Sequence, residues 1–459
     1  MLNQIPKSAV AGIGFPALGS DFASLQLAVQ YQLESSQWMD REQMQALQFR
    51  QLGPLIRHAA STVPFYRELY SQHTIPKPLT AQFFQQLPVA RRAAVQQAGD
   101  ELLCSSLPQG HEVTGWETTS GSTGRPVRIA HTRPADLLWL AFAMRDHLWH
   151  QRNFTDKLGA IRWYERGTAE PPAGYTSKNW GYIVDPLFDS APCVMLNIAS
   201  PLEQQLEWLL REKPAYLISF PSNLLALARY VEQKGLALPA IRQIRTVGET
   251  LDSNTREYIQ NVFNSRIADI YTCEEAGYLA IQCPAADHYH VQSENVLLEI
   301  VDEDGLPCEP GQPGEVLITS LNNFATPLIR YEVGDIAEFG EPCSCGRKLP
   351  VIRKILGRKR NRLILPTGES RFPYLGEYGS IHALTGQTPD QIQWIQHSTK
   401  EIEVKIVLQR PFTSEQAGKV ARQMQHNFGH PFEIRFTYLD EIPKGANGKY
   451  EDFISLVQA

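Results

Sequence analysis

Residues 215–271 read AYLISF PSNLLALARYVEQKG LALPAIR QIRTV GETLDSNTREYIQNVFNS RIADIY, and their pattern decides the fold class. Three short apolar runs, typical of buried strands, alternate with two amphipathic stretches. The first helix should begin after Pro221 and end at Gly235, and Asp252 is placed to cap the second. Strand and helix at such short intervals predict a parallel sheet, whose ligands bind at the carboxyl ends of the strands. The strands are expected at Ala215–Phe220, Gln243–Val247 and Arg266–Tyr271.

The chain before this stretch is expected to be helical first and mixed later. Apolar spacing predicts helices from about Asp40 to Tyr70. Further strands are predicted at Glu112–Thr118 and Leu158–Trp163. Residues 200–203 (Ser-Pro-Leu-Glu) have the form of a capping box with proline at the first helical position, so a helix should run to about Arg211.

The chain after Tyr289 changes to strands and turns. Asp304-Gly305 is a hairpin signal within a small barrel-like antiparallel part. Beyond Gly357, the expected order is hairpin strands, a helix and a last strand: Gln393–Leu408, Ser414–Phe428 and Glu433–Tyr438. We therefore predict an α/β protein with a large N-terminal domain at residues 1–357, which contains the parallel sheets and the barrel-like part. A small mobile α+β domain is predicted at residues 358–459.

Composition excludes several classes of protein. Of 459 residues, 43% are hydrophobic and 20% are charged, as in ordinary globular proteins, and the net charge of −6 disfavours nucleic acid as a partner. No apolar run reaches the roughly 18 residues of a membrane span. The stretch Ser8–Leu18 is faintly like a signal peptide, but Gly12, Gly14 and Pro16 interrupt it, so we expect a cytoplasmic protein. The sequence leaves open whether the protein forms a homodimer.

The stretch Thr118–Pro126 (TTSGSTGRP) is equipped to hold a polyphosphate. Its glycines allow tight turns and close backbone approach, and its hydroxyls and Arg125 add donors for an anion. The stretch lacks the GxxxxGK[ST] spacing of a P-loop, which disfavours P-loop kinases and GTPases. On these residues alone, a Ser/Gly-rich surface turn is an equally good interpretation.

This loop resembles the phosphate-binding loop of the adenylate-forming enzymes, and later stretches, in family order, resemble the phenylacetate–CoA ligase-like branch. The resemblance implies that a carboxylic acid is joined to ATP and then passed to a thiol or amine. It further implies a set of phosphate-binding residues, with Thr123 also catalytic: Ser120, Gly121, Ser122, Thr123 and Gly124.

Two further stretches resemble the family's nucleotide motifs. Gly248-Glu249 is similar to the turn beside the adenine. Residues 269–277 (DIYTCEEAG) resemble the Tyr-Gly-x-Thr-Glu-x-Gly motif, although Thr272 and Glu274 stand where the family has glycine and threonine. The resemblance implies that Tyr271 stacks on adenine, that Glu275 binds Mg²⁺, and that two more residues lie at the nucleotide: Asp269 and Thr272.

Three stretches complete the resemblance. Residues 330–335 (RYEVGD) resemble the segment whose aspartate, here Asp335, binds the ribose hydroxyls. Residues 355–361 (ILGRKRN) resemble the interdomain hinge, in which Arg358 would contact ribose or phosphate; Arg360 and Asn361 replace the family's usual acidic residues. Residues 442–449 (IPKGANGK) resemble the C-terminal loop that ends in the adenylation lysine, here Lys449.

A separate set of cysteines and histidines predicts a structural Zn²⁺ site. Three thiols and an imidazole are a suitable ligand set, and part of the branch has such a site at matching places. His290 matches better than His288 by its Tyr-His-Val context. The alternative is reduced cysteines that lie close by chance. The expected ligands are Cys283, His290, Cys343 and Cys345, while Cys104, Cys193, Cys273 and Cys308 should be free thiols.

The predicted function is an ATP-dependent acid–thiol ligase that forms an acyl-adenylate. The acid is expected to be aromatic or apolar, and the expected thiol is coenzyme A. One alternative keeps adenylation but loads an acyl carrier protein or an amine. Another is a nucleotide-binding regulatory protein with degraded chemistry, suggested by Arg360 and Asn361, against which the intact Glu275, Asp335 and Lys449 argue.

Overall fold

The computed structural model describes residues 5–118, 127–373, 375, 378–443 and 450–457. The chain divides into two compact units, Met1–Ile355 and Leu356–Ala459. Within the described part of the chain, no helix has both the length and the apolarity needed to cross a membrane.

Helices dominate the beginning of the first unit. The helices predicted between Asp40 and Tyr70 are confirmed, and Leu52, Leu55 and Ile56 of the second helix are completely buried in a core shared with the sheet. Asp40 caps this helix through a capping box. The elements are α1 (Asp21–Ser36), α2 (Arg41–Thr62), α3 (Pro64–Leu69), α4 (Ala81–Gln86), α5 (Arg92–Ala98) and a 3₁₀ turn (Gly99–Leu102).

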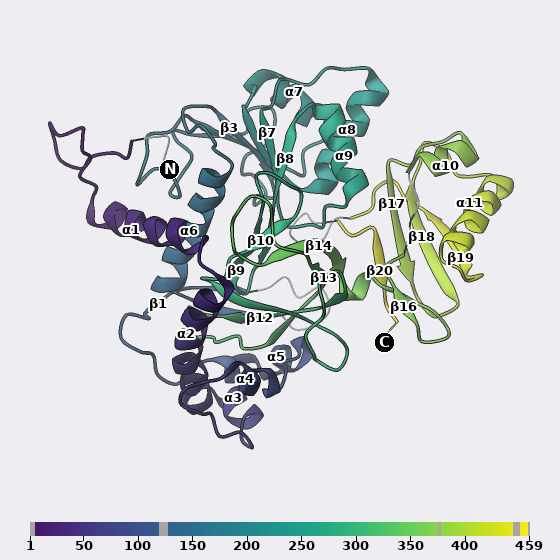
Figure 1. The fold of residues 1–459 in the computed structure, drawn as a ribbon. Coiled ribbons are helices and arrows are strands. Elements are labelled where there is room, and N and C mark those ends of the chain that lie inside the picture. Colours follow the sequence, from purple (N-terminus) through teal and green to yellow (C-terminus); the bar gives the residue numbers. More distant parts are fainter. Residues whose placement is uncertain (1–4, 119–126, 374, 376–377, 444–449, 458–459) are drawn as a thin grey trace. The chain divides into compact units, whose positions relative to one another are not determined.

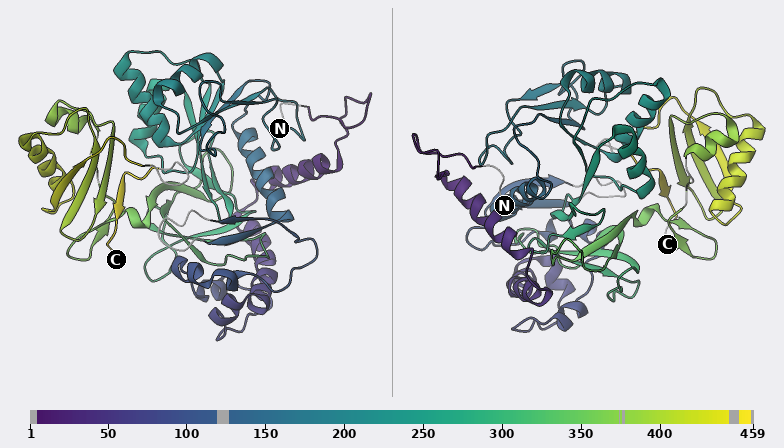
Figure 2. Two further views of the ribbon diagram at one scale, coloured as in Figure 1. Left: turned by 180° about the vertical axis from the view of Figure 1, so that it is seen from behind. Right: turned by 45° about the horizontal axis from the view of Figure 1, so that its top comes forward.

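One mixed sheet forms the body of the first unit (Figures 1 and 2). The predicted parallel sheet is confirmed, because β3 pairs in parallel with β5 and β6, and parallel pairing continues through β7 to β8. The strands of this half are β3 (Leu158–Arg162), β4 (Tyr175–Ser177), β5 (Cys193–Asn197), β6 (Tyr216–Ser219), β7 (Gln243–Thr246) and β8 (Arg266–Cys273).

The antiparallel half begins at β9, which pairs with β8. Its strands continue the parallel ones edge to edge in a single sheet of twelve strands. The predicted Asp304-Gly305 hairpin is confirmed between β11 and β12. The strands are β9 (Gly277–Gln282), β10 (Tyr289–Val291), β11 (Val296–Val301), β12 (Pro313–Ser320), β13 (Tyr331–Phe339) and β14 (Val351–Arg358).

Helices cover the parallel strands on both faces. On β3, a Cβ added to Gly159 would lie against Pro214 and Trp208, so this residue faces α7 (Leu202–Glu212). The neighbouring Leu158 packs in a cluster with Met144 of α6 (Arg133–Trp149). Because successive side chains point to opposite faces, α7 and α6 lie on different sides. Figure 1 shows α7 beside α8 (Pro221–Lys234) and α9 (Ser253–Phe263).

Two of three predicted helix ends are confirmed. Gly235 ends α8 in the left-handed conformation, and the Asp252 side chain accepts hydrogen bonds from the first turn of α9. The capping box predicted at Ser200 is wrong. Pro201 holds the N-cap position of α7, and the Ser200 Oγ instead donates to the Asn197 carbonyl at 2.6 Å.

The second unit has a four-stranded sheet in the order β19-β18-β17-β20, packed around Trp394, Phe428 and Phe432. The predicted hairpin, helix and final strand are confirmed, while the shorter elements were not predicted. The elements are a 3₁₀ turn (Lys359–Asn361), β15 (Leu363–Ile364), β16 (Ser370–Arg371), α10 (Tyr378–Thr385), β17 (Gln391–Gln396), β18 (Glu401–Val407), α11 (Ser414–Asn427), β19 (Glu433–Tyr438) and β20 (Phe453–Ser455).

Candidate active site

The carboxyl ends of the parallel strands bring the predicted nucleotide motifs together. Thr246 of β7 lies opposite Asp269 of β8, and Gly248 and Tyr271 each follow two residues later. Gly248 has a φ of 77°, which a residue with a side chain rarely adopts. The Glu249 carboxylate accepts hydrogen bonds from the backbone N–H and the hydroxyl of Ser222, both at 2.9 Å, and so joins the end of β7 to the start of α8.

Tyr271 and Asp335 meet although 64 residues separate them. The Tyr271 hydroxyl donates to Asp335 Oδ2 at 2.7 Å, and both residues are buried. Asp269 lies deeper, since its two carboxylate oxygens accept hydrogen bonds from Thr246 and Tyr289 at 2.5 and 2.6 Å. Burial raises the pKa of Asp269. This aspartate therefore fixes neighbouring strands, whereas Thr272, the residue after Tyr271, is half-buried.

Glu275 lies in a polar cluster that the sequence did not predict. Its Oε1 accepts from Arg92 at 2.8 Å and from the Tyr331 hydroxyl at 3.1 Å, and Arg92 also donates to the Val333 carbonyl at 3.2 Å. Burial raises the pKa of Tyr331, so its hydroxyl remains a donor. Arg92 opens α5, 183 residues before Glu275, and no local pattern marks it as a partner.

The predicted phosphate loop joins the two strands of a hairpin. Its strands are β1 (Val113–Thr118) and β2 (Arg128–Thr132), and Thr118 lies opposite Arg128. The residues predicted to bind phosphate, Ser120, Gly121, Ser122, Thr123 and Gly124, lie outside the described residues, as does Lys449.

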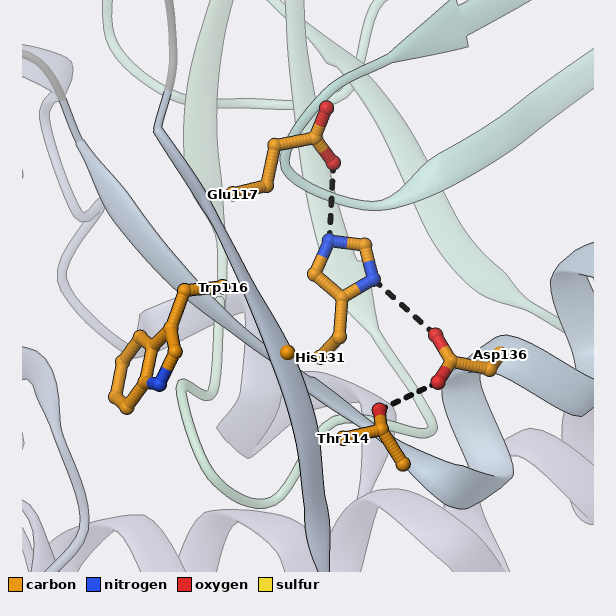
Figure 3. A pocket seen from close by; sticks show the side chains of 6 residues that line it. Thr114, Trp116, Glu117, His131 and Asp136 are labelled. Carbon is orange, nitrogen blue, oxygen red and sulfur yellow. Dashed lines mark hydrogen bonds and ion pairs between the residues drawn. The ribbon is translucent and has the colours of Figure 1, made fainter.

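A pocket of about 380 Å³ lies on this hairpin (Figure 3). At its centre, His131 Nε2 is 2.9 Å from a Glu117 oxygen and its Nδ1 is 3.2 Å from an Asp136 oxygen. The contact with Glu117, more than that with Asp136, raises the pKa of His131. Thr114 also bonds to Asp136, which links β1, β2 and α6. The lining is completed by Gly115 and Trp116.

In the second unit, Arg358 is the last residue of β14 and is half-buried. Arg360, which stands where an acidic residue was expected, forms an ion pair with Glu451 of the same unit. This pair gives the substituted arginine a structural partner.

The structure assembles the predicted zinc ligands and adds His288. The Sγ atoms of Cys283 and Cys343 are 3.7 Å apart, close to the roughly 3.8 Å expected for two thiolates on a tetrahedral zinc. One ligand atom each from Cys283, His288, His290 and Cys343 lies within 4.8 Å of the others. Cys345 is also adjacent, with its Sγ 3.4 Å from His290 Nε2. The cluster thus has five potential ligands for four positions.

The two imidazoles of this cluster are in the neutral form that binds a metal. Burial lowers the pKa of His290 to about 4, so its ring is neutral. Its Nδ1 lies 3.4 Å from the Leu349 carbonyl, which leaves Nε2 to face Cys345. The Nε2 of His288 is buried and has no hydrogen-bond partner among the described residues. A buried ring nitrogen without a partner is costly unless an ion occupies the space before it.

Comparison with known proteins identifies the family. Residues 79–326, more than half of the chain, match the AMP-binding enzyme family, and residues 381–455 match the CapK C-terminal domain. The chain belongs to the AMP-binding enzyme family. It is an adenylate-forming enzyme of the acyl–CoA ligase kind.

Relatives and solved structures agree with this assignment. The phenylacetate-coenzyme A ligase of Thermus thermophilus is 21% identical over 453 residues, which cover 91% of this chain and 98% of that protein. The Pseudomonas putida phenylacetate-coenzyme A ligase is 25% identical over 73% of this chain and 75% of its own length. A 2-hydroxyisobutyryl-CoA ligase has the same fold, with a TM-score of 0.68 at 16% identity over 91% of this chain and 90% of that one.

The two matched regions divide the predicted site of this adenylate-forming enzyme. Gly248, Tyr271 and Glu275 lie in the AMP-binding region, and Lys449 lies in the CapK C-terminal region. Asp335 falls between the two regions. Its hydrogen bond to Tyr271 attaches it to the first set.

Proposed function

We propose that this enzyme activates a carboxylic acid as an acyl-adenylate and transfers the acyl group to coenzyme A. The hydrogen bond between Tyr271 and Asp335 carries this proposal, because it joins two predicted nucleotide-binding residues at the carboxyl ends of the strands. The acid is aromatic or apolar. Relatives named phenylacetate-coenzyme A ligases and a 2-hydroxyisobutyryl-CoA ligase solved with its acyl-AMP and CoA support this class of reaction.

The chemistry explains why a nucleotide is needed. A carboxylate resists attack because attack would have to expel an oxide ion. Its oxygen instead attacks the α-phosphorus of ATP and pyrophosphate leaves, after which AMP is the leaving group for the thiol. The first step concentrates negative charge, which the donors of residues 120–124 and the Lys449 ammonium would stabilise.

The remaining site residues bind the nucleotide in this proposal. Tyr271 stacks on the adenine, Gly248-Glu249 and Thr272 lie beside it, and Asp335 accepts from the ribose hydroxyls while Tyr271 fixes its orientation. The buried Asp269 would hold the strands of this site in place, because its carboxylate accepts hydrogen bonds from Thr246 and Tyr289. Arg358 contacts ribose or phosphate. The predicted small domain, residues 358–459, turns near it between the two half-reactions.

Glu275 fits the role of a Mg²⁺ ligand. Its Oε1 is held by Arg92 and Tyr331, and none of the described residues donates to its other oxygen. Carboxylate oxygens are the ligands that Mg²⁺ prefers. The ion would neutralise phosphate charge on ATP.

The Cys/His cluster fits a structural Zn²⁺. We propose Cys283, His290, Cys343 and Cys345 as the ligands, with His288 as a fifth group beside them. Four protein ligands would close the site to substrate, so the ion would stabilise the fold and take no part in the reaction. The sulfur distance and the unpartnered His288 nitrogen support this.

Acid-dependent ATP–pyrophosphate exchange with a panel of carboxylic acids tests the proposal. Exchange should require Mg²⁺, and adding CoA should produce AMP and a thioester. ADP and phosphate as products, or ATP binding without acid-dependent turnover, would contradict it. Product analysis with CoA, an acyl carrier protein and amines separates the proposed acceptor from the two alternatives.

A further inference from the structure

Helix α1 has glutamines on its buried side and apolar side chains on its exposed side. Its buried positions include Gln26 and Gln30. Gln30 donates to the Ala141 carbonyl of α6 at 2.6 Å, but neither polar atom of the Gln26 side chain has a hydrogen-bond partner among the described residues. An ordinary surface helix buries its apolar side chains and exposes its polar ones. The sequence of α1 therefore fits a helix that is covered on both sides.

Four exposed apolar residues form a row along α1: Phe22, Leu25, Ala28 and Tyr31. They recur at every third position, so they are neighbours on the helix surface and form one ridge. The side chains of Phe22, Leu25 and Tyr31 are 44%, 43% and 76% exposed. A single exposed apolar residue needs no explanation, but a contiguous row of them marks an interaction surface.

The chain before α1 adds an apolar loop, residues 9–18, which we call the N-terminal loop. The Ala9 N–H donates to the Leu18 carbonyl at 2.7 Å and closes its base. A Cβ added to Gly12 or Gly14 would meet no other part of the described chain within 4 Å. Figures 1 and 2 show this segment projecting from the first unit beyond the start of α1. Its large apolar residues are exposed: Val10, Ile13, Phe15 and Leu18.

The size of this surface fits a protein interface. Large apolar side chains that are about half exposed would each bury on the order of 100 Å² when covered. The three large residues of the row and the four of the N-terminal loop would therefore bury roughly 700–800 Å² per chain, close to the ~800 Å² that each partner buries in a stable complex. The largest apolar patch of a typical monomer is smaller, about 300–600 Å².

The charge of this surface favours a second copy of the chain over a membrane. The row and the N-terminal loop contain no charged residue, so two copies can meet there without repulsion between like charges. A helix or loop that binds anionic lipid usually carries several basic residues. Lys7, which precedes the loop, is already paired with Asp185 at 3.1 Å.

We propose that the chain forms a dimer in which α1 packs antiparallel on α1 of a second copy. A two-fold axis that passes between Leu25 and Ala28 places Leu25 opposite the partner's Ala28 and Phe22 opposite the partner's Tyr31. Large then meets small and ring meets ring, as interlocking ridges require. The N-terminal loop of each copy extends past the start of its own helix, toward the carboxyl end of the partner's helix.

Sedimentation velocity of the full chain tests this. The wild type should have twice the chain mass of 51.7 kDa at about 20 µM, since interfaces of this size have micromolar or lower dissociation constants. Leu25→Glu should raise the dissociation constant at least about 100-fold, because it brings a carboxylate from each copy close to the axis. Leu47→Glu is the matched control and should stay dimeric, because Leu47 of α2 is a 40% exposed leucine outside the row.

A mixing experiment tests the antiparallel pairing. Ala28→Lys alone should also be monomeric, and an equimolar mixture of Ala28→Lys and Leu25→Glu should again have the mass of a dimer. The proposed axis sets the new ammonium opposite the new carboxylate, and this recovery would also show that both variants are folded.

A wild type that stays monomeric at about 50 µM would overturn the proposal, since a stable interface of this size should form there. So would a mixture without dimer, or a Leu47→Glu variant as disruptive as Leu25→Glu. Binding of a monomeric wild type to phosphatidylcholine vesicles, lost in Leu25→Glu, would assign the surface to a membrane instead. These experiments measure mass and not turnover, so their outcome is independent of the proposed function.

Discussion

The Cys/His cluster and the carboxyl ends of the parallel strands (the edge) both bring together polar side chains from distant parts of the chain. The two regions differ in whether these side chains already have partners within the protein. At the edge, protein groups already pair with the predicted ligands: Tyr271 with Asp335, Arg92 with Glu275, and Ser222 with Glu249. In the cluster, thiols and rings face one another, and within the described part of the chain His288 Nε2 has no hydrogen-bond partner.

This difference indicates that one region is stable without its ligand and that the other needs a bound ion for its stability. An edge whose charges are balanced within the protein is stable while substrates come and go. A cluster of thiols and neutral imidazoles gains its stability only when an ion binds, since the ion replaces several unfavourable contacts at once. Removing a proposed ligand-binding group at the edge should therefore affect the reaction, whereas removing a buried protein partner such as Arg92, or a group of the cluster, should affect folding.

The largest effect is expected from Lys449→Ala. The variant should lose adenylate formation by about 10²- to 10³-fold, because its ammonium is proposed to neutralise phosphate charge in that step. Thioester formation from supplied acyl-AMP should be nearly unchanged. Both half-reactions are measured beside Lys419→Ala, which removes an exposed lysine of α11. Equal loss of both half-reactions in the folded variant would show that the proposed role is wrong.

The second effect concerns the cluster. Cys343→Ser with Cys345→Ser should lower the zinc content from about one per chain to near zero and lower the melting temperature by several degrees, because a closed zinc site contributes to folding. Elemental analysis and thermal unfolding measure this, with Cys104→Ser as the control. Unchanged zinc content and melting temperature would exclude the site.

Single histidine variants refine this prediction. His290→Ala should lose zinc, because its Nε2 faces Cys345 and its Nδ1 is held by a carbonyl. His288→Ala should retain most of it. The opposite result would make His288 the ligand and show that the Tyr-His-Val context is a poor guide here.

A third, smaller effect is expected at Arg92. Arg92→Gln leaves the buried Glu275 carboxylate without its cation and should destabilise the fold by roughly 1–3 kcal/mol. Arg91→Gln is the control next to it, since its ion pair with Glu315 is 45% exposed on the arginine side and should be worth about 0–1 kcal/mol. Urea unfolding compares the two, and equal effects would contradict a special role for Arg92.

The sequence predicted the parts of the molecule that depend on local pattern. The alternation in residues 215–271 predicted the parallel strands, and Asp252 and Gly235 predicted the ends of their helices. Serine is a common helix-capping residue, which is why Ser200 was predicted to cap α7. Its hydroxyl instead donates to the Asn197 carbonyl, and this depends on the conformation of the loop before the helix. The pairing of β10 with β14 likewise joins distant parts of the chain, which no local pattern predicts.

The candidate site divides in the same way. Motif residues such as Tyr271, Asp335 and Cys283 could be selected because each stands in a recognisable context. Arg92 could not, because its role depends on the buried carboxylate that lies beside it in the folded chain.

The smallest expected effect is a pH dependence at His131. Its pKa is raised, mainly by Glu117, so the protonated ring is favoured in the folded state. The stabilisation should be complete below the ordinary value of about 6.5 and should be lost as pH rises through the higher folded value. The melting temperature of wild type should thus exceed that of His131→Gln most near pH 6 and least near pH 8.5. Because the ring is 37% exposed, the difference should be a few degrees at most.

In a Glu117→Gln background, the same comparison should lose most of its pH dependence. A difference that stays constant from pH 6 to 8.5, or that grows with pH, would show that His131 stabilises the hairpin by packing and not by charge.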